Sequence, residues 1–535
     1  MNSSSSRIRV ATKLRWALPP TISAVLLVVA FPPFGWPIFA WIALIPLFLH
    51  LPHYKPLNGF ASGYLFGTLF YMLLMGWTAE IADIHTHHFI LLGLVLGSFL
   101  GLYTGLATRL LFYFPKWSPL TLPALWVTIE YLRSHIGFLS QPFGILAYSQ
   151  YQVLSVAGVS AYTGIFGVSF LLVASNALLA SLIRPYAAFT LGIYSSARNS
   201  YRPIAPMAIV LILLFGWPQL HAGDKETTTL ETLDVAIVQG NAQAHKELSQ
   251  ERYQAEVLPV YEQLTRSAEG TALVVWPSSS VPGVIPTDRA MTKRLAGLAR
   301  ETDSYLLIGA AGFDKFDAEQ SRQKRIANSA FLFTPSGRIG GRYDKIRLLP
   351  FDEYLPARDL IPWPEWLISS ETTDHSPGKE LTIFETGRAR FGVQICFENM
   401  FPDQTRQLAR KGAHLLVAQT NESYTNSLAG HLQNIPYYVF RAIENRIPVL
   451  RSSTTGISCI IDATGRIIDS VKDPSGRQIE VAGLAKGRIV LSSDRSFYTR
   501  HGDLFTYACI VTVASFLALS FFSGRGRPGK RKQGG

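Results

Sequence analysis

The most informative segment of the sequence is Phe391-Gly392-Val393-Gln394-Ile395-Cys396-Phe397-Glu398. A largely apolar run ends at Cys396, as in a buried strand, and a helix-like segment begins soon after, at Pro402. A thiol at such a strand-to-helix elbow can project into a cleft, where helix amides or a nearby cation favour the reactive thiolate. The alternative is an inert buried cysteine, which is the commoner state of a single cysteine.

Short β-rich runs and helical stretches alternate on both sides of this elbow. The predicted strands are residues 233–238, 272–276, 305–309, 329–333, 389–395, 415–419 and 448–452, and the predicted helices are residues 251–266, 291–301 and 402–411. Strands interleaved with helices predict an α/β layered domain. The region is long enough to form one large domain with its own core.

Two further stretches of this domain carry candidate chemistry. Residues 341–356 include Lys345, which could stabilise an oxyanion, and Glu353, which could orient the lysine. Residues 272–276 are hydrophobic and lead into an abrupt turn at Ser278. Taken alone, the first stretch is an ordinary charged loop and the second is only the end of a strand.

The composition indicates that part of the chain lies in lipid. The 535 residues are 48% hydrophobic and 16% charged, whereas a soluble protein has about 25% charged residues. The net charge of +12 does not indicate nucleic-acid binding, because the Lys and Arg residues lie beside apolar runs and form no single stripe. The three cysteines are far apart, so they predict neither a disulfide framework nor a zinc cluster, and no cofactor is expected.

Seven apolar runs precede the α/β domain, and one follows it. They are residues 17–30, 36–51, 59–77, 89–107, 120–132, 164–183 and 204–220, and then 504–522. Several are shorter than the ~20 residues that a spanning helix needs. The first run follows basic residues, as a signal peptide does, but the second comes so soon after it that a retained span is expected.

The charges between these runs predict a topology. With a cytoplasmic N-terminus, the inside loops contain most of the cations, and the outside loops contain acids and histidines with Arg133 as their one cation. This alternation predicts a multi-pass protein of about eight spans. Residues 1–222 form an N-terminal membrane domain with about seven helices, 230–498 an extracytoplasmic domain, 504–522 a C-terminal span, and 523–535 a basic cytoplasmic tail.

One acid, Glu130, lies inside a predicted span. An ionisable residue at such a position is a candidate functional residue. The simpler interpretation is a local pair with Arg133, which lies three residues later on the same helix face.

The three candidate stretches together resemble the nitrilase superfamily, in which a strand ends in a glutamate base, a later loop carries a lysine, and a cysteine nucleophile lies at an elbow. With the apolar runs before and after it, the chain most resembles the apolipoprotein N-acyltransferases. Two stretches of the predicted membrane domain add to this resemblance. The first is Trp126-Val127-Thr128-Ile129-Glu130-Tyr131-Leu132-Arg133, followed by Pro142-Phe143-Gly144 and Ala147-Tyr148-Ser149-Gln150. The second is Pro33-Phe34-Gly35, followed by Trp41 and Pro46. The resemblance implies an α-β-β-α sandwich inserted between membrane spans.

The resemblance also assigns roles by position. Cys396 corresponds to the nucleophile and Lys345 to the lysine that stabilises the oxyanion, and the supporting residues are Glu353, Phe397 and Glu398. A helix-like run with Arg441 and Glu444, and the stretch 451–456, match the family pattern near the floor of the active site.

The chain departs from the family at the base. The family's strand ends in Trp-Pro-Glu, whereas this chain has Trp276-Pro277-Ser278. A serine hydroxyl is no general base near neutral pH, and loss of a positioned base costs about 10²–10⁴-fold in rate. Glu353 and Glu398 are candidate substitutes, although both are also expected to support the lysine or the cysteine loop. A smaller departure is Tyr424, where the family usually has a tryptophan.

The resemblance implies an acyl transfer at the inner membrane of a Gram-negative cell, with the catalytic domain in the periplasm. A phospholipid would acylate Cys396, and the thioester would pass the acyl chain to the amine of a diacylglyceryl-cysteine lipoprotein. Two alternatives remain open: a homologue that binds lipid or lipoprotein without turnover, and a membrane-tethered amidase or nitrilase that acts on a small amide.

Overall fold

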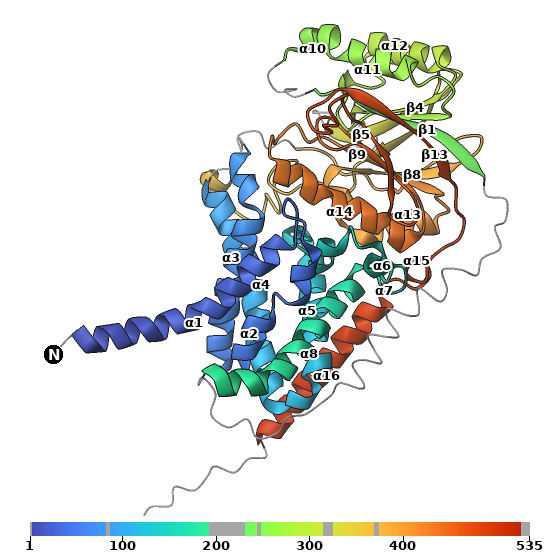
Figure 1. The fold of residues 1–535 in the computed structure, drawn as a ribbon. Helices are drawn as coiled ribbons and strands as arrows, with labels where there is room; N and C mark the ends of the chain where they lie inside the picture. The colour runs from blue at the N-terminus through green and yellow to red at the C-terminus, as the bar shows by residue number, and fades with distance from the viewer. Residues whose placement is uncertain are drawn as a thin grey trace, which may run out of the picture.

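The computed structural model describes residues 3–81, 86–191, 231–242, 248–313, 325–368 and 374–525. The seventh predicted span, 204–220, and most of the predicted tail lie outside these residues. Within them, a helical half is joined to an α/β half, and the last helix returns to the helical half (Figure 1).

The helical half consists of long apolar helices joined by short ones. Its α-helices are α1 (Ser3–Val29), α2 (Ile45–His50), α3 (Pro56–Leu74), α4 (Thr86–Tyr113), α5 (Ser118–His135), α6 (Leu154–Ala157), α7 (Ser160–Thr163), α8 (Ile165–Leu191) and α16 (Leu504–Arg525), and its 3-10 helices are η1 (Pro37–Trp41), η2 (Leu51–His53), η3 (Gly76–Glu80), η4 (Pro115–Trp117), η5 (Gly137–Leu139) and η6 (Leu146–Gln150). Small residues bring α3 and α4 together, because a Cβ on Gly67 would lie 3.0 Å from the backbone of Gly97.

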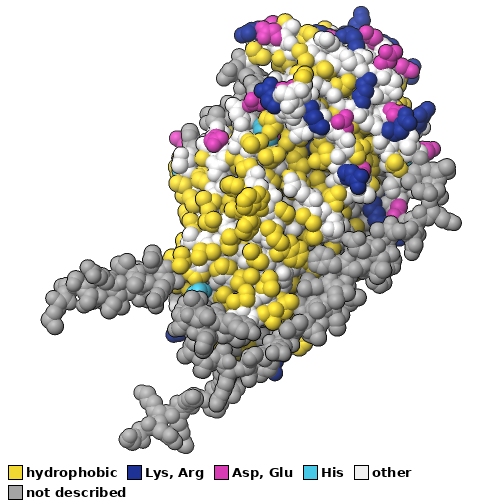
Figure 2. Space-filling view, viewed as in Figure 1, with side chains coloured by type: hydrophobic (Ala, Val, Ile, Leu, Met, Phe, Trp, Pro, Cys, Tyr) yellow, Lys and Arg dark blue, Asp and Glu magenta, His cyan; other side chains and the backbone are white. Residues whose placement is uncertain are grey.

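Four helices of the described residues are long and apolar enough to cross a membrane: Pro56–Leu74, Thr86–Tyr113, Ile165–Arg184 and Leu504–Ser523. Apolar side chains cover the visible face of the helical half, while charged side chains gather on the α/β half (Figure 2). Phe112 and Val511 are exposed on this half although both are large and apolar, as expected for surfaces that face lipid. The predicted total of eight spans stays a prediction.

The second predicted span, 36–51, forms no single helix. It folds as η1, α2 and η2 in succession, and Pro37 and Pro46 lie in the first turns of η1 and α2. Proline lacks an N–H and fits best in the first turn of a helix, and a new helix begins at each of these two prolines, so the run is divided.

Glu130 and Arg133 do not make the local pair that their spacing suggested; both bind the segment after α5. The Glu130 carboxylate accepts a hydrogen bond from Leu146 N at 2.8 Å. Arg133 donates to the carbonyl oxygens of Gln141 and Phe143, the latter at 2.6 Å. The two side chains therefore fold the 136–150 segment against α5.

The α/β half contains two mixed sheets. The first has the order β13-β1-β2-β4-β5-β6, with β3 beside β4, and the second has the order β12-β11-β10-β9-β8-β7. The strands are β1 (Thr232–Gln239), β2 (Leu273–Val275), β3 (Val281–Val284), β4 (Tyr305–Phe313), β5 (Ile326–Phe333), β6 (Ile339–Asp344), β7 (Ile383–Glu385), β8 (Arg390–Ile395), β9 (Leu415–Thr420), β10 (Val449–Ser453), β11 (Cys459–Ile461), β12 (Ile467–Ser470) and β13 (Gly483–Val490).

Helices cover the outer face of each sheet, which makes four layers. The helices are α10 (Gln250–Glu256), α11 (Leu258–Arg266), α12 (Arg289–Glu301), α13 (Pro402–Arg410), α14 (Leu428–Asn445) and α15 (Phe497–His501), with η7 (Glu365–Leu367) and η8 (Cys396–Met400). Along β1, Val235 and Ile237 face the second sheet while Ala236 and Val238 face α11 and α12, because successive side chains of a strand alternate. Helices α13 and α14 lie between the second sheet and the helical half (Figure 1).

All seven predicted strands correspond to strands of the structure, and the predicted helix 251–266 is divided into α10 and α11 before Pro259. The elbow lies at the end of β8, in the second sheet, and α13 and α14 separate this sheet from the helical half.

Candidate active site

Cys396 lies where β8 ends and η8 begins. Its φ of +53° places it in the left-handed region, which non-glycine residues seldom adopt and which is found at strained functional turns. The neighbours Ile395 and Phe397 are buried, whereas Cys396 is partly exposed. The elbow therefore presents the thiol while the residues beside it anchor the turn in the core.

Glu398 joins this elbow to the loop that follows β6 through hydrogen bonds to both segments. Its fully buried carboxylate accepts hydrogen bonds from Ile395 N at 2.8 Å and from Ile346 N at 2.8 Å. It also accepts from Tyr343 Oη at 2.7 Å and from Gln404 Nε2 at 3.0 Å. With these donors on its two oxygens, Glu398 holds the cysteine turn and the lysine loop at a fixed separation.

Lys345 follows β6 and is buried against Glu353. Its Nζ lies 2.6 Å from Glu353 Oε2, which also accepts from Leu349 N at 2.8 Å. Burial works against the ammonium, but the Glu353 carboxylate keeps the pKa of Lys345 above its usual range. Burial likewise opposes the carboxylate, and Lys345 outweighs it and lowers the pKa of Glu353. The pair is therefore held in its charged form.

Ser278 is linked to this pair through Asn328 on β5. The Ser278 hydroxyl donates to Asn328 Oδ1 at 3.4 Å, and Asn328 Nδ2 donates to Glu353 Oε1 at 3.3 Å. The backbone at Ser278 also packs closely against Gly309, because a Cβ on Gly309 would lie only 2.5 Å from Ser278 Cα. Position 278 thus belongs to the same cluster as Lys345, but it contributes a neutral hydroxyl that is only 1% exposed.

The Cys396 thiol is held in its neutral form by its surroundings. Burial raises its pKa, the Lys345 charge lowers it, and the carboxylates of Glu353, Glu422 and Asp352 raise it, so that the pKa lies above the usual value of a thiol. The nucleophile of a thiol is its thiolate. A reaction at Cys396 therefore requires a group that takes up the thiol proton.

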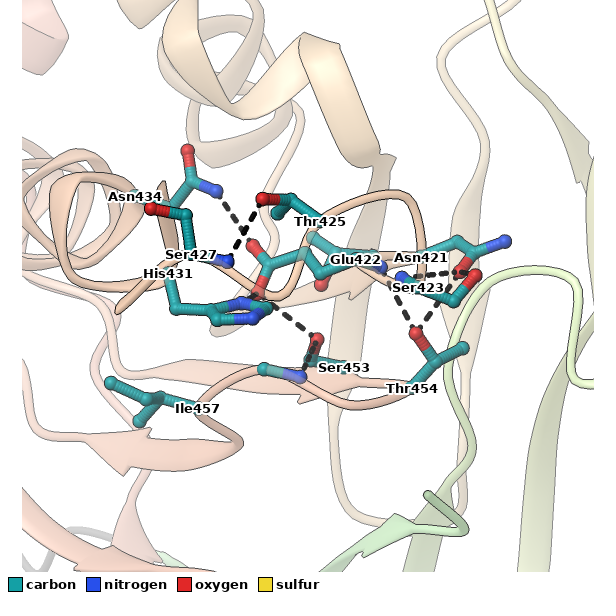
Figure 3. A network of polar contacts seen from close by, with 12 residues as sticks. Asn421, Glu422, Ser423, Thr425, Ser427, His431, Asn434, Ser453, Thr454 and Ile457 are labelled. Carbon is teal, nitrogen blue, oxygen red and sulfur yellow. Dashed lines mark hydrogen bonds and ion pairs between the residues drawn. The ribbon is translucent and has the colours of Figure 1, made fainter. Parts of the chain in front are cut away.

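A third buried carboxylate, Glu422, was not identified from the sequence. It follows β9 and accepts from Asn434 Nδ2 at 2.7 Å and from Ser453 Oγ at 3.3 Å, and it lies 3.2 Å from His431 Nδ1 (Figure 3). The Arg451 guanidinium also binds this carboxylate. Although burial opposes ionisation, Arg451 and His431 lower the pKa of Glu422 to about 2.

This network supports the loop that carries Tyr424. Residues Asn421 to Thr425 follow β9, and Glu422 N and Asn421 Oδ1 both bond the hydroxyl of Thr454 (Figure 3). The sequence feature that could have indicated a buried acid is Arg451, because an arginine inside a buried strand requires an acidic partner. The identity of that partner depends on the pairing of β9 with β10, which local sequence does not specify.

Arg441 and Glu444 lie at the junction between α14 and the helical half. Arg441 Nη2 is 2.6 Å from the Glu444 carboxylate, which accepts from Ile165 N at 2.8 Å and so caps the start of α8. Burial raises the pKa of Glu444 to about 7. Nearer the start of α14, Gln433 Nε2 donates to the carbonyls of Pro32 and Leu74, each at 2.9 Å. These residues therefore join the two halves of the chain.

Acidic, histidine and cysteine side chains of the described residues nowhere form a group of three or more that could hold a metal ion. Cys396, Cys459 and Cys509 are all free thiols. The site itself brings together the Cys396 thiol, the Lys345 ammonium and the carboxylates of Glu353 and Glu398.

Comparison with known proteins matches both halves of the chain. Residues 234–489 match the family model described as carbon-nitrogen hydrolase, and residues 23–178 match the apolipoprotein N-acyltransferase N-terminal domain. The apolipoprotein N-acyltransferase of Geobacter metallireducens is 32% identical over 521 residues, which cover 94% of this chain and 95% of the relative. Apolipoprotein N-acyltransferase 1 of Treponema denticola is 28% identical and covers 91% of this chain and 92% of its own length.

Proposed function

Because the chain belongs to the apolipoprotein N-acyltransferase family, we propose that it transfers a fatty acyl chain from a phospholipid to the N-terminal amine of a diacylglyceryl-cysteine lipoprotein. The observation that carries the proposal is the Cys396 elbow, which Glu398 ties to the loop of the buried Lys345 ammonium. This site lies in the half of the chain that packs on apolar helices, as an enzyme with two lipidic substrates requires.

The first step is acylation of Cys396. Its sulfur attacks the ester carbonyl of the phospholipid, and the thiol proton passes to a base. A C–S bond forms, the C–O bond of the ester breaks, and the lysophospholipid leaves with a proton returned to its oxygen. Lys345 stabilises the oxyanion of the tetrahedral intermediate, a contribution for which one donor is commonly worth about 10²–10³-fold in rate.

The second step is transfer to the lipoprotein. The free α-amine attacks the thioester carbonyl, the C–N bond forms, the C–S bond breaks, and the amine loses a proton. Cys396 is thereby regenerated, and Lys345 again faces the oxyanion. Glu353 positions Lys345, and Glu398 with Phe397 positions the cysteine turn.

The charge pattern of the loops supports a multi-pass protein of the inner membrane with the α/β domain on the periplasmic side. In that orientation, residues 1–222 form the membrane domain, 504–522 the last span and 523–535 the cytoplasmic tail. The phospholipid donor would then come from the outer leaflet of that membrane.

The test is transfer to a synthetic peptide that begins with diacylglyceryl-cysteine. Incubated with phospholipid vesicles, the unaltered chain is expected to add one acyl chain to this peptide, as measured by mass spectrometry. Cys396→Ala should abolish the product, and a peptide with an acetylated α-amine should not accept the chain. Failure of both the unaltered chain and Ser278→Glu to acylate the free peptide would contradict the proposal.

The raised pKa of the Cys396 thiol, with a neutral Ser278 that is linked through Asn328 to Glu353, favours a second candidate function. In it, the protein binds lipid or lipoprotein without turnover because it has no base. The same assay separates the two, since acylated peptide that appears only after Ser278→Glu would identify the impaired homologue.

A further inference from the structure

Asn328, a partly buried residue near the start of β5, contacts three parts of the candidate site. Its side-chain amide donates to Glu353 Oε1 at 3.3 Å, and its side-chain oxygen accepts from the Ser278 hydroxyl at 3.4 Å. Its backbone oxygen accepts from Lys345 N at 2.9 Å. Asn328 therefore lies between position 278 and both members of the Lys345–Glu353 pair.

The two oxygens of the Glu353 carboxylate have different partners. Oε2 lies 2.6 Å from Lys345 Nζ and accepts from Leu349 N at 2.8 Å, whereas Oε1 accepts from Asn328. The last torsion of a glutamate is broad and roughly two-fold, so partners on one oxygen alone leave the plane of the carboxylate free to turn. The Asn328 amide therefore fixes this plane.

The backbone of the lysine loop is held independently of this carboxylate. Ile346 N and Ile395 N donate to the two oxygens of Glu398, each at 2.8 Å, which fixes the loop relative to the cysteine turn. Lys345 N is bound to the backbone of β5 at 2.9 Å. These bonds leave open the direction of the Lys345 side chain, whose flexible stem ends at the Glu353 carboxylate.

The Lys345–Glu353 pair is buried, so the protein rather than water sets the position of the ammonium. A charge-assisted hydrogen bond is short and strong in such surroundings, and Lys345 Nζ therefore follows the Glu353 oxygen that it binds. A donor that stabilises an oxyanion must lie about 2.7–3.1 Å from the developing charge. A carboxylate that turned would therefore move the ammonium away from the position that the reaction requires.

We propose that Asn328 is a positioning residue of the acyl transfer. By binding Glu353 Oε1, it orients the carboxylate that directs the Lys345 ammonium toward the oxyanion formed at Cys396. The inference rests on the proposed function and deepens it. A side-chain amide neither gains nor loses a proton near neutral pH. The hydrogen bonds that run from Ser278 through Asn328 to Glu353 therefore orient groups and do not carry the thiol proton.

The experiment measures thioester formation on the full chain by intact-mass spectrometry, with vesicles of phosphatidylethanolamine and phosphatidylglycerol that carry palmitoyl chains. Asn328→Leu removes the donor and keeps a side chain of similar size. It is expected to slow the reaction about 10–10²-fold at saturating vesicle concentration, because a misplacement of about 1 Å can cost about 10²-fold. The vesicle concentration that gives half of the maximal rate should not change. The control is Gln263→Leu, which removes an exposed amide on α11 and should leave the rate unchanged.

The readout specific to the donor is the pH dependence of Asn328→Asp, which keeps the shape of the side chain. An ionised carboxylate cannot donate to Glu353 Oε1 and repels it, whereas a protonated carboxyl group can donate. Partial burial and the neighbouring carboxylate favour protonation above the ordinary range of an aspartate. The rate of this variant, divided by that of the unaltered chain at the same pH, should rise from about pH 8 to about pH 5. The same ratio for Asn328→Leu should stay constant.

A rate unaffected by Asn328→Leu would overturn the assignment, and so would a loss that appears only as weaker binding of vesicles. Parallel pH profiles of Asn328→Asp and Asn328→Leu would also contradict it, because the lost donor would then not be the cause. Either result leaves the proposed function intact. If thioester forms only after Ser278→Glu, the same variants are compared in that chain. If neither the unaltered chain nor Ser278→Glu forms a thioester, the proposed function fails, and the assignment of Asn328 fails with it.

Discussion

Two buried carboxylate–cation pairs of the same length behave differently. Glu353 with Lys345 lies in the candidate site, and Glu444 with Arg441 lies at the junction between the two halves, each with a separation of 2.6 Å. The pKa of Glu353 is below the usual value of a glutamate, whereas the pKa of Glu444 is raised to about 7. Distance to the cation therefore does not decide the charge state.

The surroundings of each pair account for the difference. Glu353 retains slight exposure and accepts from the Leu349 amide and from Asn328 in addition to Lys345. Glu444 is fully buried, and the negative charge of Asp503 further raises its pKa. Donors stabilise a carboxylate, and burial and like charge destabilise it. The pair at the site is locked in its ionised form, and the pair at the junction titrates near neutral pH.

Replacing Lys345, the cation of the pair in the candidate site, should have the largest effect on stability and on activity. Lys345→Met leaves Glu353 buried without its cation and is expected to cost about 3–5 kcal/mol of stability. Loss of the oxyanion donor should also lower acyl transfer by about 10²–10³-fold. Thermal unfolding in detergent and the peptide assay check the two effects. The exposed Lys472→Met is the control, and equal activity of the two variants would exclude Lys345 from the reaction.

The junction pair should make stability depend on pH. The folded pKa of Glu444, about 7, exceeds its ordinary value, so the folded state holds the extra proton between about pH 4.5 and 7. Its contribution is therefore fully present below about pH 4.5 and is lost as pH rises through 7, a change of about 3 kcal/mol. The lowered pKa of Glu353 acts in the opposite sense and weakens the fold as pH falls below the ordinary range of a glutamate.

Stability measured between pH 5 and 8 in the unaltered chain and in Glu444→Gln checks this prediction. The variant, which cannot ionise at this position, should lose the decline that the unaltered chain shows toward pH 7. The same slope in both proteins would assign it to other groups.

A smaller loss of stability is expected when the uncharged side chain of Gln433, which hydrogen-bonds the two halves at their junction, is replaced. Gln433 donates to Pro32 O and Leu74 O and accepts from Trp77 Nε1 at 2.9 Å. Gln433→Leu leaves these three groups without their partner and should cost about 1–3 kcal/mol. Comparison with Gln407→Leu, on the exposed face of α13, by thermal unfolding gives the measurement. Equal melting temperatures would mean that the hydrogen bonds of Gln433 do not hold the two halves together.

The smallest effect is expected at Ser278. Its hydrogen bond to Asn328 is long, at 3.4 Å, so Ser278→Ala should cost about 1 kcal/mol or less. The rate of thioester formation should stay within about twofold, because the hydroxyl is no base near neutral pH. A large loss of rate in this variant would show that Ser278 takes part in the reaction.

The sequence predicted the parts of the fold that have strong periodic signals. The buried strands β1, β8 and β9 are nearly continuous apolar runs, and each was predicted within about two residues at either end. The edge strands β12 and β13 are partly exposed and mix glycine or charged residues with apolar ones, so their pattern resembles a loop. Their positions follow from pairing with β11 and β1, which is a tertiary property.

The same distinction between local sequence signals and tertiary contacts applies to the residues of the candidate site. Cys396, Lys345, Glu353 and Glu398 were located by order and flanking residues, and the structure brings all four together with Ser278. Asn328 and Glu422 were missed because their roles depend on partners more than 20 residues away in the chain. Arg441 and Glu444 were expected near the floor of the active site; Arg441 donates to Met400 O of η8 at 3.5 Å, and Glu444 caps α8.

The most direct test is the intact mass of the purified chain after incubation with phospholipid vesicles. We expect an increase by one acyl chain, which hydroxylamine removes and Cys396→Ala prevents, because the adduct is a thioester on that residue. An unaltered chain that remains at its original mass, together with a Ser278→Glu chain that does the same, would contradict the assignment of Cys396 as the nucleophile of an acyltransferase.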